Sequence, residues 1–265
     1  VSFSFATETL LADADIILAV QPPTADLVAT MKPGALLVSF VYGAANPGLV
    51  TALKDRGVTA LAMELIPRIS RAQSMDALSS QAALAGYYAP LLGAVHMPRI
   101  LPMMTTAVGS IRPAKTLVMG LGVAGLQALA TARRLGSMVE GYDVRPETKE
   151  QAESLGAKFV DTGVDARGQG GYARALTVEE KAQVRQVLSR HIAEADMIIT
   201  TAAVPGKRAP ILIAADQVAA MKPGAVIIDL GAESGGNCEG TRPGETVGSL
   251  RAVVLVALGT ALMAL

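Results

Sequence analysis

Along the chain, short aliphatic runs typical of strands alternate with longer stretches that have the periodicity of helices. Short runs of aliphatic, often β-branched residues are each followed by a loop and then by an amphipathic or alanine-rich stretch of helical length. Uninterrupted apolar runs are typical of parallel strands buried on both faces. An apolar stripe with helical periodicity is typical of helices that pack on such a sheet. The alternation predicts an α/β fold with parallel sheets.

A near-repeat occurs at residues 14–38 and again at 195–229. Each copy has Ala-Asp before an aliphatic run, a proline in the following loop, and Met-Lys-Pro-Gly before a second aliphatic run. The Pro-Gly pair supplies the turn that ends a helix, so each copy predicts strand, loop, helix, turn and strand. Two copies of one βαβ element predict two similarly wound domains, through shared ancestry or through a shared fold solution.

An alanine-rich segment between the two copies, residues 76–95, predicts a long helix that Ser74 or Asp76 caps. Its apolar residues lie on more than one face, which suits a helix buried between domains. Prolines then mark an irregular connector: Pro98, Pro102 and Pro113. We expect two Rossmann-like, doubly wound parallel-sheet domains joined by this helix. The first would span residues 1–96, including the helix, and the second residues 97–265.

Residues 115–136 contain a dinucleotide-binding fingerprint in its structural context. An expected strand, 116–119, leads into Gly-Leu-Gly-Val-Ala-Gly, and a helix follows that Gly136 stops. The alternative is a glycine-rich turn that merely joins a strand to a helix. Strand, helix and the acid at the end of the next strand together favour the nucleotide site.

Each glycine of the fingerprint has a distinct expected role. Gly120 permits the tight turn, Gly122 lets the backbone approach a pyrophosphate, and Gly125 lets helix and strand pack closely. The first-turn amides, which include Val123 and Ala124, and the helix dipole receive the negative charge.

Asp143 ends the next expected strand, about twenty residues after the fingerprint begins. A carboxylate there accepts hydrogen bonds from the adenosine ribose hydroxyls. It also repels a 2′-phosphate, by roughly 3 kcal/mol for each charge pair at about 5 Å and an effective dielectric constant near 20. Arg145 lies close enough in the sequence to soften that preference. The residues therefore predict NAD(H) in preference to NADP(H).

Composition narrows the functional classes further. Of 265 residues, 51% are hydrophobic and 17% are charged, which excludes a disordered or collagen-like chain. Lys plus Arg equals Asp plus Glu at 23 each, so no basic field exists to hold nucleic acid. A single Cys and two His argue against a disulfide framework and against a Cys- or His-based metal site.

The two ends of the sequence carry expectations of their own. The chain opens at Val1 with no Met and no signal peptide, so we expect an incomplete chain. Residues 252–265 form an apolar run too short to span a bilayer. A buried strand followed by the start of a helix is expected there, and a membrane-associated segment is the alternative.

Polar side chains concentrate in residues 64–79, just before the long helix. One interpretation is a solvated loop with a helix cap. The other is that Arg68, Gln73 and Asp76 face a cleft and contact a ligand bound on the other domain. A second polar segment, residues 162–172, is rich in glycine, and a loop of that length is usually functional or mobile.

No residue presents itself as a proton-transfer group. His96 and His191 suit surface or capping roles, and Cys238 has no evident base partner. A dehydrogenase that oxidises an alcohol or amino acid needs a positioned acid or base, whereas hydride transfer between two nicotinamides needs only close approach and orientation. The shortage favours the second chemistry.

With these residues in view, the chain resembles the NAD(H)-binding domain I of proton-translocating NAD(P) transhydrogenase over about residues 10–247. The most specific motif is Pro-Arg-Ile-Ser-Arg-Ala-Gln-Ser-Met-Asp-Ala-Leu-Ser-Ser-Gln at residues 67–81. The other shared motifs lie at residues 122–128, 142–145, 170–173, 199–207 and 235–238.

The resemblance implies that NAD(H) binds in the interdomain cleft and that the protein is a homodimer. Hydride passes to NADP(H) held on domain III, a partner component, and a membrane domain couples this step to proton movement. The chain would therefore lie on the cytoplasmic side of the inner or plasma membrane, peripheral to it through its partner.

The resemblance also implies residue roles. The loop that carries Arg68, Gln73 and Asp76 orients the nicotinamide, with Ser79 nearby. Tyr172 lies on a mobile loop that closes over the nucleotide. The expected lining of the NAD site comprises Val123, Ala124, Asp143, Val144, Arg145, Gly171 and the backbone near Ala203.

Some family features are missing from this sequence. The family's opening strand–helix segment is absent before Val1, its pattern breaks after about Val247, and the glycine-rich loop before Tyr172 is shorter. Alanine dehydrogenase shares the two-domain fold and is the alternative enzyme; its catalytic acid would fall near Glu233. A noncatalytic NAD-binding regulatory module is the third interpretation. The loop at residues 68–76 argues against both alternatives.

Overall fold

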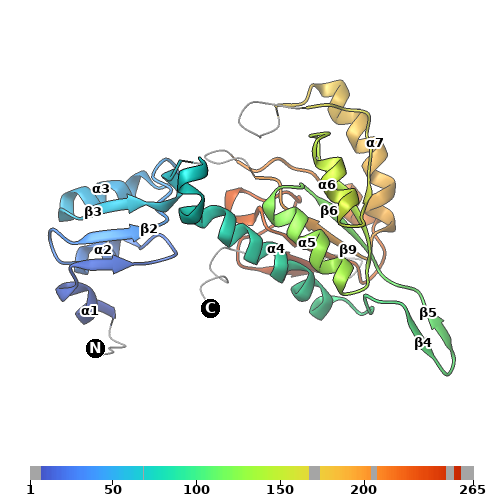
Figure 1. The fold of residues 1–265 in the computed structure, drawn as a ribbon, viewed down its shortest axis with the longest axis horizontal. Coiled ribbons are helices and arrows are strands. Elements are labelled where there is room, and N and C mark those ends of the chain that lie inside the picture. Colours follow the sequence, from blue (N-terminus) through green and yellow to red (C-terminus); the bar gives the residue numbers. More distant parts are fainter. Residues whose placement is uncertain (1–6, 68, 167–173, 204–207, 249–253, 258–265) are drawn as a thin grey trace. The chain divides into compact units, whose positions relative to one another are not determined.

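The computed structural model divides the chain into two compact units, and each is described by itself. The first unit ends at Gln81 and the second begins at Ala82. The structure describes residues 7–67, 69–166, 174–203, 208–248 and 254–257 (Figure 1).

The first unit is built on a three-stranded parallel sheet with strand order β1-β2-β3. Its elements are α1 (Thr7–Asp13), β1 (Ile16–Leu18), α2 (Ala25–Thr30), β2 (Leu36–Ser39), α3 (Pro47–Arg56), β3 (Thr59–Ala62) and two 3₁₀ turns, η1 (Met63–Leu65) and η2 (Ser70–Met75). Helix α3 begins with Pro47, which has no backbone N–H that would need a hydrogen-bond partner in the first turn. Gly57, with φ of 71°, caps its C-terminal end.

Helices α1, α2 and α3 pack on one face of this sheet. That core joins Ile17 and Leu37 of the strands to Val28 and Leu53 of the helices. The opposite face keeps Ile16 62% and Leu18 76% exposed. The expectation of strands buried on both faces is therefore wrong for this sheet among the described residues, because α1, α2 and α3 all cover the same side.

The second unit contains a seven-stranded sheet with order β11-β12-β10-β9-β6-β7-β8, parallel except for β11 against β12. From β8 to β12 this is the strand order 3-2-1-4-5-6 of a doubly wound dinucleotide-binding fold. Its strands are β6 (Lys115–Met119), β7 (Met138–Tyr142), β8 (Lys158–Phe159), β9 (Met197–Thr200), β10 (Val226–Asp229), β11 (Thr246–Gly248) and β12 (Val254–Ala257). The strand expected in the apolar run near the C-terminus is thus confirmed as β12.

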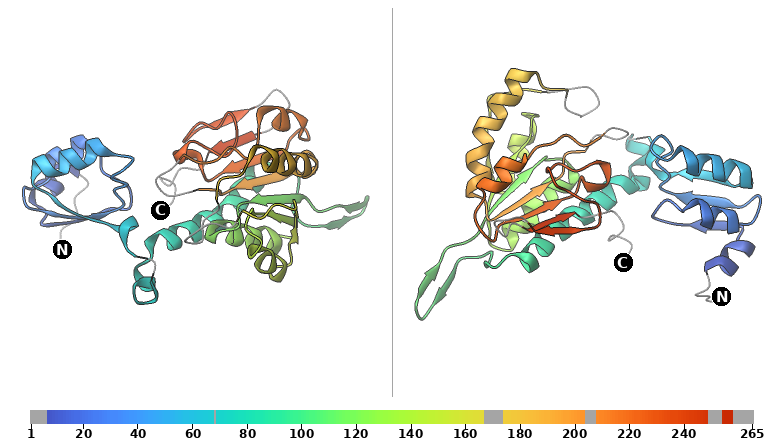
Figure 2. Two further views of the ribbon diagram at one scale, coloured as in Figure 1. Left: turned by 90° about the horizontal axis from the view of Figure 1, so that it is seen from above. Right: turned by 180° about the vertical axis from the view of Figure 1, so that it is seen from behind.

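Helices cover both faces of this sheet (Figure 2). On one face lie α4 (Ala77–His96), α5 (Val123–Arg134) and α6 (Thr148–Ser154), and on the other lie α7 (Val178–Glu194) and α8 (Ala215–Ala220). Strands β9 and β10 are buried at every position, as their aliphatic runs predict. None of the helices in the described part of the chain combines the length and hydrophobicity that a bilayer crossing requires.

Small residues let α4 approach the second unit closely. A Cβ added at Gly86 would lie 2.1 Å from the carbonyl oxygen of Ala124, and one at Gly93 would lie 2.7 Å from the sulfur of Met197. Most of α4 therefore belongs by its contacts to the second unit. The sequence prediction, with its boundary after residue 96, gave this helix to the first domain.

The near-repeat is confirmed as β1-α2-β2 and β9-α8-β10, and it contains an ion pair that the sequence pattern did not predict. Lys32 lies 2.6 Å from Asp15 in the first copy, and Lys222 lies 2.9 Å from Asp196 in the second. In each copy the Lys-Pro-Gly turn at the end of the helix thus binds the aspartate that precedes the first strand.

Candidate functional site

The fingerprint turn joins β6 to α5 with the backbone that its glycines permit. Gly120 has φ of 98°, in the left-handed region that favours glycine. A Cβ at Gly125 would lie 1.8 Å from the carbonyl oxygen of Gly120, so the helix packs directly on the turn. The expected roles of Gly120 in the turn and of Gly125 in close packing fit this geometry.

The surface beside the start of α5 is open. Gly122 is the N-cap residue, and a Cβ built on it would meet nothing within 4 Å. Val123, the first residue of the helix, is 44% exposed, and Ala124 follows it. A helix N-terminus with room in front of it can receive a phosphate from its first-turn amides. The turn thus has the shape and the polarity that a pyrophosphate needs.

Asp143 follows β7 and is 9% exposed. Its Oδ2 accepts hydrogen bonds from the backbone N–H of Leu121 (2.7 Å) and from Nη2 of Arg145 (2.8 Å). Its Oδ1 accepts from the backbone N–H of Arg145 (2.9 Å) and from Nε of Arg145 (2.9 Å). The carboxylate is therefore tied to the fingerprint turn on one side and to a bidentate guanidinium on the other. Val144, between the two, packs partly buried against the core beneath α7.

The loop after β9 lies against the same turn. The hydroxyl of Thr201 donates to the carbonyl oxygen of Gly120 (2.8 Å), and the backbone N–H of Thr201 donates to Met119 (2.9 Å). Ala203, two residues later, is exposed. The strand order reverses between β6 and β9, where doubly wound folds bind their ligands. The carboxyl ends of strands β6, β7 and β9 thus carry the fingerprint turn, Asp143 and this loop.

The polar loop of the first unit contains a helix cap. Asp76 Oδ1 accepts from the backbone N–H of Ser79 (2.9 Å), and Oδ2 accepts from the Ser79 hydroxyl (2.7 Å). Gln73 is exposed in η2. Arg68, Gly171 and Tyr172 lie outside the described residues. Asp76 therefore has the capping role, and the roles of Gln73, Asp76 and Ser79 at the nicotinamide stay predictions.

The remaining candidates take structural positions. His191 pairs through Nδ1 with Glu140 at 2.7 Å. Cys238 is buried, and both desolvation and the nearby Asp229 carboxylate raise the pKa of its thiol to about 12, so it is not a nucleophile near neutral pH. Glu233, the position of the alternative enzyme's acid, is exposed in η4 (Ala232–Ser234). The described residues contain no cluster of His, Cys, Asp and Glu fit to hold a metal ion.

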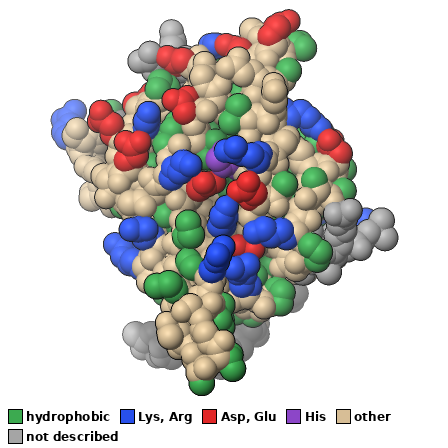
Figure 3. Space-filling model, turned by 90° about the vertical axis from the view of Figure 1, so that its right-hand side faces the viewer, with side chains coloured by type: hydrophobic (Ala, Val, Ile, Leu, Met, Phe, Trp, Pro, Cys, Tyr) green, Lys and Arg blue, Asp and Glu red, His purple; other side chains and the backbone are tan. Residues whose placement is uncertain are grey.

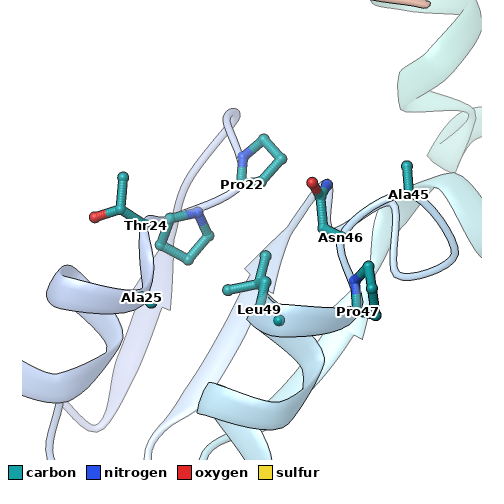
Figure 4. Close-up of a pocket in the computed structure, with 9 residues that line it drawn as sticks. Pro22, Thr24, Ala25, Ala45, Asn46, Pro47 and Leu49 are labelled. Carbon is teal, nitrogen blue, oxygen red and sulfur yellow. The ribbon is translucent and has the colours of Figure 1, made fainter.

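A hollow of about 530 Å³ lies in the first unit, where the loops after β1 and β2 lead into α2 and α3 (Figure 4). Its polar side chains are already engaged. Thr24 accepts from the backbone N–H of Leu27 (3.3 Å), and Asn46 donates to the carbonyl oxygen of Val41 (3.1 Å). The side chains that line it carry no charge, so they offer no ionisable group.

Sequence reasoning missed two residues of the second unit. Thr201 holds the fingerprint turn, and the buried Asn237 holds the loop after β9. Both fall inside motifs that the resemblance singled out, at residues 199–207 and 235–238, but their spacing in the sequence does not reveal their contacts.

Comparison with known families matches almost the whole chain. The description "Alanine dehydrogenase/PNT, N-terminal domain" fits residues 3–85, and "Alanine dehydrogenase/PNT, C-terminal domain" fits residues 89–261. Among solved structures, a transhydrogenase from Sinorhizobium meliloti matches with a TM-score of 0.81 at 43% identity, over 94% of this chain and 68% of that one. An L-alanine dehydrogenase matches with a TM-score of 0.72 at 25% identity, over 93% of this chain and 64% of that one.

Named relatives of this chain include the same two enzymes. The first part of NAD(P) transhydrogenase subunit alpha from Rhodospirillum rubrum is 49% identical over 246 residues, which cover 89% of this chain. Alanine dehydrogenase from Mycobacterium tuberculosis is 32% identical over 235 residues, which cover 88% of this chain. The chain spans 64% of the length of the first relative and 58% of the second.

Proposed function

Because the chain belongs to the alanine dehydrogenase/PNT family, we propose that it is the NAD(H)-binding component of a proton-translocating NAD(P) transhydrogenase. The observation that carries the proposal is the open fingerprint turn at the carboxyl edge of the second sheet, with Asp143 beside it. The higher identity to the transhydrogenase subunit than to alanine dehydrogenase supports this enzyme over its relative.

The described residues at this edge fit a dinucleotide. The backbone from Gly120 to Gly125 and the N-terminus of α5 would hold the pyrophosphate. Asp143 would receive the adenosine ribose, with Val144 and Arg145 beside it. Because Arg145 occupies both carboxylate oxygens, a ribose hydroxyl must take over one of the guanidinium contacts. The backbone at Ala203 and Gly171 would complete the site.

Bound NADH supplies the hydride, and the protein supplies position. Arg68, Gln73, Asp76 and Ser79 would orient the nicotinamide, and Tyr172 would close over it. Direct transfer to a second nicotinamide requires no proton donor from this chain. Asp143, the acid beside the fingerprint turn, accepts four hydrogen bonds from Leu121 and Arg145, which suits a role in holding a ligand better than a role in proton transfer.

The remaining partners follow from the same proposal. NADP(H) would be held by domain III, a membrane domain would couple transfer to proton movement, and this chain would lie peripherally on the cytoplasmic side. The Rhodospirillum rubrum relative is named as one part of a divided alpha subunit, which supports an enzyme of several components. Domain III is therefore the component to add in a functional test.

The test mixes the full-length protein with an NADP(H)-binding domain III and follows transfer from NADH to an NADP analogue before steady state. We expect transfer, and we expect Gln73→Asn to slow it by roughly ten- to a thousandfold while NADH affinity changes little, because orientation acts mainly on the transition state. Gln73 suits this test because its side chain is exposed and its shortening removes no core packing.

Two other outcomes would contradict the proposed function, and a third would contradict the role of Gln73. Oxidative deamination of L-alanine with NAD, without transfer to domain III, would assign the protein to alanine dehydrogenase. NADH binding with neither activity would indicate a regulatory module. Transfer at the parent rate in Gln73→Asn would remove that residue from the nicotinamide site and leave its loop a helix cap.

A further inference from the structure

We propose that Asn237 is a positioning residue that holds the loop after β9 in place and thereby sets the affinity for the nicotinamide half of the dinucleotide. This inference rests on the proposed NAD(H) site of the second unit. It gives a role to the Gly-Gly-Asn-Cys motif, which the mechanism above leaves without one.

The side-chain amide of Asn237 bridges two loops of the second unit. Its Nδ2 donates to the carbonyl oxygens of Ala202 (2.8 Å) and Pro210 (2.8 Å), and its Oδ1 accepts from the backbone N–H of Ala202 (3.0 Å). Asn237 is completely buried. An N–H and two carbonyls face this amide, so only one orientation satisfies them, and only an amide offers both an acceptor and two donors. Both backbone groups of Ala202 are thus fixed by one side chain.

The turn that presents Asn237 is itself fixed. Gly235 and Gly236 have φ of 105° and 79°, conformations that other residues rarely adopt. The Asp229 carboxylate lies fully buried at the end of β10. It accepts five hydrogen bonds: from the backbone N–H groups of Gly231 (2.9 Å), Asn237 (2.8 Å) and Cys238 (3.2 Å) and from the hydroxyls of Thr200 (3.0 Å) and Thr241 (2.6 Å). These donors compensate for the burial of the charge and anchor the motif to β10.

The loop that Asn237 holds touches the fingerprint turn. A Cβ at Gly120 would lie 2.8 Å from the Thr201 hydroxyl oxygen and 3.0 Å from the backbone nitrogen of Ala202. The Thr201 hydroxyl donates to the Gly120 carbonyl at 2.8 Å. A shift of Ala202 would therefore change the wall of the crevice next to the pyrophosphate position.

The fold indicates which half of the nucleotide this wall serves. A doubly wound sheet consists of two mononucleotide-binding halves that meet where the strand order reverses. Asp143, the expected ribose ligand, belongs to the half formed by β6, β7 and β8, which takes the adenosine. Asn237, Asp229 and Ala202 belong to the half formed by β9, β10 and β12, which takes the nicotinamide mononucleotide. Loosening the Asn237 contacts should therefore weaken binding of the nicotinamide half more than binding of the adenosine half.

Calorimetric titration of the 265-residue chain with NADH and with ADP separates the two halves. For Asn237→Ala we expect the Kd for NADH to rise by roughly tenfold or more. The Kd for ADP, which has both phosphates but lacks the nicotinamide riboside, should stay within about twofold of the parent value. Thr201→Val, which keeps the side-chain shape and removes one contact of the same loop, should show the same pattern to a smaller extent. It also keeps the inference testable if Asn237→Ala does not fold.

Ser137→Ala is the matched control. Ser137 is buried just before β7, at the amino ends of the parallel strands and so away from the proposed site. Its hydroxyl donates to the carbonyl oxygen of Ala114 (2.8 Å) and contacts the Thr116 hydroxyl (2.7 Å). Its loss should lower Tm without changing either Kd. An equal loss of NADH and ADP affinity in Asn237→Ala, or an unchanged NADH affinity in the folded variant, would overturn the inference. A parent chain that binds neither ligand would overturn the proposed function and this inference with it.

Discussion

At the scale of single residues, the Asp143 carboxylate serves two purposes. Its contacts with Leu121 and Arg145 join the end of β7 to the fingerprint turn. Under the proposed function its charge would also meet the adenosine ribose, and the guanidinium of Arg145 partly neutralises that charge. The preference between NADH and NADPH should therefore depend on the pair rather than on the aspartate alone.

We predict that the parent protein binds NADH roughly tenfold or more tightly than NADPH, and that Asp143→Asn narrows this gap. Removal of the negative charge ends the repulsion of a 2′-phosphate and weakens the hold of residue 143 on the Arg145 guanidinium, which can then pair with that phosphate. Titration calorimetry with both nucleotides measures the effect. In the double variant with Arg145→Ala, the gain in NADPH affinity should disappear. Equal affinities in the parent would contradict the assignment of Asp143.

The positions of residues in a locally spaced motif could be predicted, and contacts between residues far apart in the sequence could not. The fingerprint glycines and Asp143 follow a fixed spacing within one βαβ unit, so the sequence contains the whole signal. Thr201 meets Gly120 across 81 positions, and Asn237 meets Ala202 across 35. Only the pairing of β6 with β9 and of β9 with β10 brings these residues together.

At the scale of elements, the near-repeat predicted two βαβ units correctly but did not predict how differently they are buried. Strands β9 and β10 are buried throughout, whereas β1 has one buried position between two exposed ones. The strands of both copies are rich in aliphatic residues, which shows only that each strand is able to be buried. Whether a second layer covers it depends on elements elsewhere in the chain, which composition does not reveal.

The same difference predicts unequal effects for the two Lys-Asp pairs. Asp196 has a side chain 8% exposed and also accepts from Arg99 (3.4 Å) and the backbone N–H of Lys115 (2.8 Å). Lys222→Met should therefore lower the free energy of unfolding by about 1 kcal/mol, because it removes one of three partners of a buried carboxylate but the lysine itself is 40% exposed. Chemical denaturation followed by circular dichroism measures this change.

Lys32→Met is the matched control for that prediction. The pair with Lys32 lowers the pKa of Asp15, through their hydrogen bond first and their charges second. However, Asp15 is 82% exposed in its side chain, and solvent screens such a pair. Lys32→Met should leave the unfolding curve unchanged. A larger effect from Lys32→Met than from Lys222→Met would show that burial does not decide the strength of the pair.

At the scale of the whole molecule, one element of the second unit lacks a core of its own. Strands β4 (Met104–Thr106) and β5 (Gly109–Ile111) form a hairpin that pairs with no other strand of the described chain. Val108 at its tip is 98% exposed and Met103 before it is 70% exposed. Figure 3 faces this end of the unit, where Lys and Arg side chains gather. A two-stranded hairpin alone is marginally stable in water, so burial against a second copy would explain its apolar side chains.

We therefore predict that the protein is a homodimer and that the hairpin contributes to the contact between copies. The double change Met103→Ser and Val108→Ser should shift the dimer toward monomer in sedimentation velocity at micromolar concentration. The fold should be unaffected, because both side chains are exposed within one copy. Val178→Ser, at the start of α7 and 78% exposed, is the matched control and should leave the dimer intact. If the hairpin variant remains as dimeric as the parent, the hairpin is not part of the interface, and a parent that is already monomeric would refute the homodimer itself.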